Sequence, residues 1–181
     1  LKKDIIETPE ELAEQTFDAL KNKDFDDITK LYMTETEGRA WADDFFELEV
    51  PDDVKASEGE EKVGGLPVEE FFLAVAISEN PKQALEFAQE EHQDFWNKAA
   101  DHGLNWGDLE ISSVGKFERS ESSLPGSLED WAERKVKKGA FSIELTSNGK
   151  KFHLMLPCIY SPSTGFHLHF QYFIQDFKPK Q

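Results

Sequence analysis

The chain of 181 residues contains one cysteine, Cys158, so no disulfide can form within it. This fits a reducing compartment, although proteins of the periplasm also often lack disulfides. The longest apolar run, FFLAVAI at 71–77, is far shorter than the roughly 20 residues that span a bilayer. The sequence therefore predicts a soluble protein with no membrane insertion, either cytoplasmic or exported after removal of an N-terminal signal.

Basic residues are scarce as well. The chain has 20 lysines and arginines against 37 acidic residues, which gives a net charge of −17 at pH 7. The excess lies in residues 1–100, with 27 acidic and 10 basic side chains, whereas residues 101–181 carry 10 of each. Such a field repels nucleic acid and anionic lipid and attracts basic proteins. We expect no nucleic-acid binding, and either a basic protein partner or a surface that serves only solubility.

Motifs of common enzymes are also absent from the sequence. It contains no glycine-rich phosphate loop, no G-x-S-x-G and no H-E-x-x-H. Acidic pairs such as Asp26-Asp27 and Glu90-Glu91 are sequence neighbours, and neighbouring positions on a helix point apart. We therefore predict no cofactor, and the absence of motifs favours a protein that is not an enzyme.

Residues 1–100 contain apolar residues at helical spacing. In ETPEELAEQTFDALKNKD, Thr8 suits the N-cap, Pro9 the first helical position, and Glu11 a capping box. Asp24 is expected to cap a second helix. A third, short helix is expected to carry Trp41, Phe45 and Leu48. Further expected segments are a loop at 51–67 and helices at 67–78 and 81–100.

After residue 106 the apolar period changes to two, which is typical of strands. Expected strands run over 109–117 (with a bulge at Gly115), 136–147, 150–160 and 165–175. Asn148-Gly149 predicts a type I′ hairpin turn, and this register pairs apolar with apolar residues, Phe141 with Leu156 for example. A five-residue loop at 161–165 would then pair Tyr160 with Phe166. It would also place His153 opposite Phe173.

These elements predict an α+β fold in which N-terminal helices pack on a curved C-terminal antiparallel β-sheet. We expect a single domain over 1–181, with a helical half at about 8–101 and the sheet at about 106–175.

Strand alternation places the histidines of TGFHLHFQYFIQ on the outer face of this sheet. The cross-strand neighbours of His167 and His169 are Ile159 and Pro157, which supply no metal ligand, so we predict no metal site. That face is half apolar, which favours homodimerisation through it. The candidate contact residues are Met155, Ile159, His167, His169 and Phe173.

The core side offers the only candidates for a pocket. His92 lies on the apolar side of the helix at 81–100, while Tyr160 and Tyr172 lie on the core face of the sheet. Together they could carry out acid–base chemistry of the isomerase or dehydratase type. Alternatively, His92 is a satisfied core residue, and a cavity there would hold a small apolar ligand without any reaction.

The stretch AEQTFDALKNKDFDDITKLYMT (13–34) and the sheet at 139–174 together resemble the NTF2-like, or cystatin-like, α+β superfamily. Phe17, Leu20, Asp24, Phe25 and Leu31 carry the resemblance. It implies a cone-shaped fold, often dimeric, with an apolar pocket. The extra helices between 36 and 100 depart from the pattern, and no catalytic set of the superfamily matches. The leading hypothesis is a small, acidic, non-enzymatic binding or interaction domain.

Overall fold

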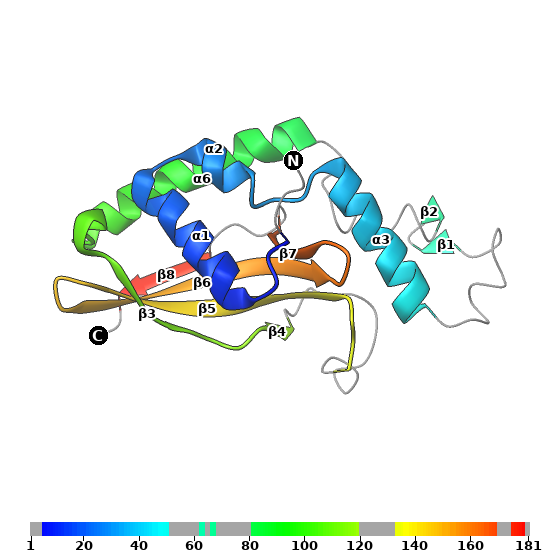
Figure 1. The fold of residues 1–181 in the computed structure, drawn as a ribbon. Coiled ribbons are helices and arrows are strands. Elements are labelled where there is room, and N and C mark those ends of the chain that lie inside the picture. The colour runs from blue at the N-terminus through cyan, green and yellow to red at the C-terminus, as the bar shows by residue number, and fades with distance from the viewer. Residues whose placement is uncertain are drawn as a thin grey trace.

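The protein adopts an α+β fold in which helices pack against a curved antiparallel sheet (Figure 1). The computed structural model describes residues 5–50, 62–63, 66–67, 81–119, 133–169 and 175–179. Helices α1, α2 and α6 lie on one side of the sheet, and α3 lies at the end of the strands (Figure 1). The predicted fold class is confirmed, whereas the single domain stays a prediction. No helix within the described ranges is long and apolar enough to cross a membrane.

Helix α1 (Pro9–Asn22) begins where the sequence predicts. Thr8 is the N-cap, and its Oγ1 accepts a hydrogen bond from the Glu11 backbone N–H at 3.1 Å. The Glu11 carboxylate, however, accepts from the backbone N–H of Glu7 at 3.0 Å, one residue earlier than a capping box requires. The box predicted here is therefore only half formed.

The next two helices are also capped by side chains. Asp24 caps α2 (Phe25–Thr29) as expected, accepting from two backbone N–H groups of its first turn. Helix α3 (Glu35–Glu49) has 15 residues and is not short, because a complete capping box between Thr34 and Glu37 starts it early.

Trp41, Phe45 and Leu48 lie on this helix as predicted; Trp41 and Phe45 are buried, whereas Leu48 is 42% exposed. The last turn of α3 meets the sheet through the carboxylate of Glu49, which accepts from the backbone N–H of Val136.

Helix α6 (Pro81–Asp101) confirms the helix predicted at 81–100, and its buried side includes Ala88, His92, Phe95 and Ala99. The stretch expected as a loop contains two paired strands, β1 (Lys62–Val63) and β2 (Leu66–Pro67), and its remainder lies outside the described residues. So does the helix predicted at 67–78, apart from Pro67, which belongs to β2.

The main sheet has the order β3-β5-β6-β7, with β4 also paired to β5 and β8 to β6. Its strands are β3 (Glu110–Val114), β4 (Glu118–Arg119), β5 (Lys137–Ser147), β6 (Lys150–Ser161), β7 (Gly165–Leu168) and β8 (Gln175–Pro179). The predicted β5–β6 hairpin is confirmed, with Phe141 opposite Leu156 and Asn148 and Gly149 at φ 49° and 73°. These positive φ values are those that a type I′ turn requires.

Two predicted strands are interrupted in the structure. The strand expected at 109–117 ends at Val114, and a register shift lies between Ile111 and Ser113. The strand expected at 165–175 is divided into β7 and β8, which both pair with β6. The predicted pair of His153 with Phe173 is therefore wrong. His153 lies opposite Lys178 instead, since the β6–β8 pairing shifts register between His153 and Met155.

The turn between β6 and β7 is tighter than predicted. Tyr160 pairs with Phe166 as expected, but Ser161 and Gly165 also pair, so the connection is residues 162–164. Gly165 has φ 74°, and a Cβ there would collide with the carbonyl oxygen of Ile6. That close approach is needed because the outer edge of β7 is bonded by the N-terminal part of the chain. The backbone N–H of Phe166 donates to Ile6 O at 2.8 Å, and that of Leu168 donates to Leu31 O at 2.8 Å.

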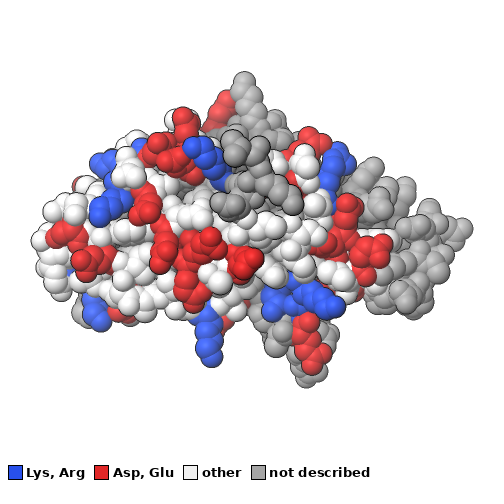
Figure 2. Space-filling model, viewed as in Figure 1, with Lys and Arg blue, Asp and Glu red and all other residues white. Residues whose placement is uncertain are grey.

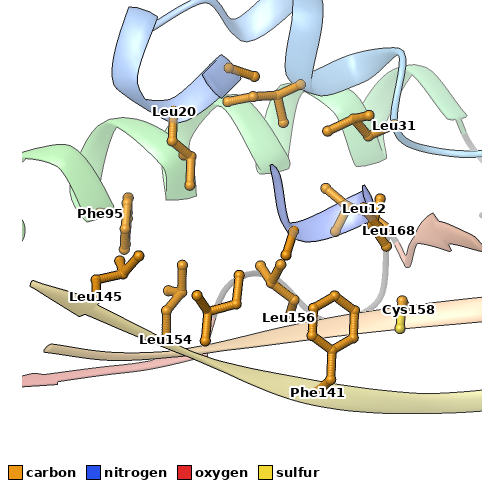
Figure 3. Packing of buried hydrophobic residues seen from close by; sticks show 14 of the residues in the cluster. Leu12, Leu20, Leu31, Phe95, Phe141, Leu145, Leu154, Leu156, Cys158 and Leu168 are labelled. Carbon is orange, nitrogen blue, oxygen red and sulfur yellow. The ribbon is translucent and has the colours of Figure 1, made fainter. Parts of the chain in front are cut away.

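The main core lies between the helices and the inner face of the sheet (Figure 3). Helices α1 and α6 contribute residues such as Leu12, Leu20 and Phe95, which meet a row of apolar side chains from β5 and β6. Full burial of one such side chain contributes about 1.5–3 kcal/mol. Cys158 belongs to this core, and burial raises the pKa of its thiol, so it behaves as a small hydrophobe.

Candidate functional site

His92 lies in an aromatic environment between α2 and α6. Its ring is fully buried, 5.4 Å from the ring of Phe25 in an edge-on arrangement and 5.8 Å from that of Trp96. Trp96 is itself fixed, because its Nε1–H donates to Leu20 O at 3.1 Å. Burial lowers the pKa of His92 from 6.5 to about 3. The imidazole is therefore neutral at pH 7 and poorly matched to proton transfer there.

Tyr160 contacts Phe166 and Trp41 and has no described contact with His92. Its ring is half-buried and packs against that of Phe166 at 4.6 Å, while its backbone carbonyl accepts a hydrogen bond from Trp41 Nε1 at 3.1 Å. No described contact joins His92 to Tyr160, and Tyr172 lies outside the described residues. A pocket shared by these residues stays a prediction.

Three of the five residues proposed for a dimer contact on the outer face of the sheet are buried. His167, His169 and Ile159 are 3%, 2% and 0% exposed, so they are buried within the chain and do not form an open contact surface. Met155 is half-buried, and Phe173 lies outside the described residues. The expected exposure of the two histidines is wrong. Homodimerisation itself stays a prediction.

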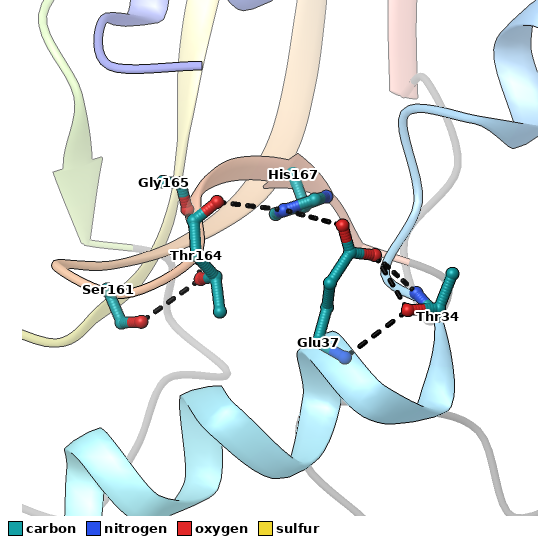
Figure 4. A network of polar contacts seen from close by, with 6 residues as sticks. All are labelled: Thr34, Glu37, Ser161, Thr164, Gly165 and His167. Carbon is teal, nitrogen blue, oxygen red and sulfur yellow. Dashed lines mark hydrogen bonds and ion pairs between the residues drawn. The ribbon is translucent and has the colours of Figure 1, made fainter. Parts of the chain in front are cut away.

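His167 belongs to a polar network at the end of the sheet (Figure 4). Its Nε2 lies 3.1 Å from the carbonyl oxygen of Thr164 and 3.9 Å from Glu37 Oε1 on α3. Because a carbonyl can only accept, the first contact requires a proton on Nε2. The other carboxylate oxygen of Glu37 accepts from Thr34 N at 2.8 Å and from Thr34 Oγ1 at 2.9 Å. The capping box of α3 thus holds this carboxylate in place beside the histidine.

The same helix holds the strand ends through four side chains, Glu37, Trp41, Asp44 and Glu49, which we call the α3 clamp. Asp44 accepts from Ser163 N at 2.9 Å and from Ser163 Oγ at 2.7 Å. Glu49 Oε1 accepts from the backbone N–H groups of Lys135 and Val136 at 2.7 and 3.0 Å. Most of these bonds go to backbone atoms at strand ends. Sequence patterns gave no sign of them beyond the T-x-x-E spacing of Thr34 and Glu37.

Metal-ligating side chains are not grouped in the described ranges. No three histidine, cysteine or acidic residues there lie close enough together to hold an ion.

Exposed carboxylates form a second candidate site on α1. Glu10, Glu14 and Asp18 follow one another at a spacing of four residues, on the face opposite the buried Leu12 and Leu20. We call them the α1 acidic stripe. All three are exposed, and none forms an ion pair with a described residue. Figure 2 shows acidic side chains at several places on the face of the molecule that is seen in Figure 1.

Comparison with protein families, with curated proteins and with solved structures finds no match to this chain. The resemblance to the NTF2-like superfamily therefore stays a prediction.

Proposed function

We propose that this chain is a small, non-enzymatic interaction domain that binds a basic protein through the acidic surface of its N-terminal helices. Residues 5–50 carry 14 acidic and 4 basic side chains, a net charge of −10. Every one of these acidic side chains is exposed or half-buried. Surface potential of one sign raises the association rate with oppositely charged partners.

The α1 acidic stripe is the observation that carries this proposal. Like charges four residues apart destabilise a helix by about 0.2–0.5 kcal/mol per pair. Glu10 lies in the first turn, where the helix dipole favours a negative charge, but Glu14 and Asp18 lie beyond it. Two acids of the other helices are offset within the chain, in the ion pairs Lys30–Asp27 and Arg39–Glu35. A stripe that forms no ion pair with the described residues fits a surface whose positive charges come from another molecule.

The pocket-enzyme alternative has less support. It requires His92 to exchange a proton near neutral pH, whereas burial lowers the pKa of this residue to about 3. The binding proposal makes no use of this histidine.

The test compares two variants of equal net charge. In the first, the three residues of the α1 acidic stripe are changed to their amides. In the control, three exposed acids of α6 are changed in the same way, by Glu90→Gln, Asp94→Asn and Asp101→Asn. Binding of a fluorescein-labelled oligolysine peptide is followed by fluorescence anisotropy at increasing sodium chloride, with an oligoglutamate peptide as the negative probe.

We expect the stripe variant to bind oligolysine several-fold more weakly than the control, because three exposed charge pairs at about 0.2–1 kcal/mol each are lost. We also expect the affinity of the unaltered protein to fall steeply with salt. Equal affinities of the two variants would show that the stripe is no binding surface, and salt-independent binding would contradict an electrostatic contact.

A further inference from the structure

The described contacts between α3 and the sheet include a histidine side chain, that of His167. Most bonds of the α3 clamp join a carboxylate or an indole N–H to backbone atoms at the strand ends. The contact between Glu37 and His167 differs, because histidine ordinarily gains or loses its charge between pH 5 and 8. The two side chains are 24% and 4% exposed, so solvent screens their contact less than it screens a surface pair.

We propose that His167 and Glu37 form a pH-sensitive latch, in which protonation of His167 strengthens its contact with Glu37 and tightens the attachment of α3 to the end of the sheet. In the neutral ring, Nε2 carries a proton and donates to Thr164 O. An added proton therefore binds at Nδ1, and the Thr164 bond is kept. The positive charge then spreads over both nitrogens, with Nε2 only 3.9 Å from Glu37 Oε1.

Glu37 is well placed to act as the fixed half of this latch. Its Oε2 accepts two hydrogen bonds from Thr34, so the carboxylate needs no rearrangement when the ring becomes charged. A preorganised acceptor gains more from a new charge than one that must first be ordered, because the conformational entropy is already lost.

Two other described residues that can carry a positive charge, Lys138 and His169, lie on the same face as His167. Lys138 on β5 lies opposite Ile159, which lies opposite His167, so the three side chains form one cross-strand row. Burial lowers the pKa of Lys138, which reduces its repulsion of a charged ring. His169, two residues along the chain and 2% exposed, lies on the same face. Glu37 Oε1 lies 3.9 Å from His167 Nε2, whereas Lys138 lies on β5, which β6 separates from the strand of His167.

The experiment uses Glu37→Gln, because glutamine also serves in a capping box. Its carbonyl oxygen can accept from Thr34, and the uncharged NH2 then takes the place of Oε1 beside His167. The first readout is the NMR titration of the His167 ring proton between about pH 5 and 8. We expect its midpoint to lie at least about half a pH unit lower in the variant, a threefold or greater loss of proton affinity. An unchanged midpoint, or no titration of His167 in that range, would overturn the proposal.

The second readout is hydrogen exchange at the indole N–H of Trp41, which is fully buried and bonded to Tyr160 O. Opening of α3 exposes this group. We expect its protection factor to rise several-fold from about pH 7.5 to 5.5 in the unaltered protein and to stay constant in Glu37→Gln.

Asp44→Asn is the matched control, since it removes another clamp carboxylate, whose bonds to the described residues both go to Ser163. We expect it to lower the Trp41 protection factor equally at both pH values. If the protection factor of Glu37→Gln rose with acid as much as that of the unaltered protein, the latch would be refuted.

Discussion

Replacement of His92 tests whether a neutral, fully buried imidazole limits the stability of this fold in acid. The pKa of His92 is lowered from 6.5 to about 3 in the folded chain, so between these values the unfolded chain binds a proton that the folded chain does not. Stability from this group is therefore complete above about pH 6.5 and is lost as the pH falls, by up to about 1.4 kcal/mol per pH unit. At about pH 5 the loss amounts to roughly 2 kcal/mol.

His92→Leu removes the titrating group and keeps an apolar side chain of similar size beside Phe25 and Trp96. Urea unfolding at about pH 7.5 and about pH 5 gives the free energy of unfolding of both proteins. We expect the unaltered protein to lose roughly 2 kcal/mol more than the variant between these two pH values. The difference between two proteins is measured because the many acidic residues also titrate in this range.

The control is His102→Leu, which removes a histidine at an exposed position just after α6 instead of the buried one. A free-energy difference between the His92 variant and the unaltered protein that stays constant with pH would refute the reasoning. It would mean that the buried ring is charged in the folded chain.

Three further predictions concern single contacts. Each is measured as a change in the free energy of unfolding, obtained from the urea midpoint. Trp41→Phe should cost more than about 1 kcal/mol, because the hydrogen bond to Tyr160 O is lost and the smaller buried ring leaves a cavity; an unchanged midpoint would contradict this packing. Asp24→Ala should also cost about 1 kcal/mol through the lost N-cap of α2, and Asp24→Ser should restore most of it. Gly139→Ala should cost more than about 2 kcal/mol, because the new Cβ would collide with Glu118 O and separate β4 from β5; near-normal stability would contradict that packing.

The parts of the fold that the sequence predicts correctly are those fixed by local chemistry. Asn148-Gly149 permits the positive φ values of a tight turn, and the alternation on both sides of it then has one register that keeps apolar residues on one face. The eleven β5–β6 pairs follow from these two conditions. The caps at Thr8 and Asp24 are correct for the same reason, since each bond joins residues close in sequence.

The errors occur where distant segments decide the outcome. Alternation assigns His167 and His169 to the outer face, but it contains no information about what covers that face, and both are buried. The division of the last strand into β7 and β8 depends on a register shift against β6 that no local pattern marks. The sequence does not predict the α3 clamp, because nothing in the local pattern distinguishes Glu37, Asp44 and Glu49 from ordinary surface acids. Only the folded chain brings the strand ends close to them.

The closure of the β7 edge has a consequence for the order in which the protein folds. Ile6 and Phe166 are 160 positions apart in sequence, yet their backbones are hydrogen-bonded, and Leu31 meets Leu168 in the same way. During synthesis, the helical half leaves the ribosome long before the strand against which it is fixed. Contacts of such high sequence separation slow folding, because the entropy of closing the intervening chain is lost before they form. We therefore expect α1 and α2 to dock late, after the β5–β6 hairpin has provided a surface for them.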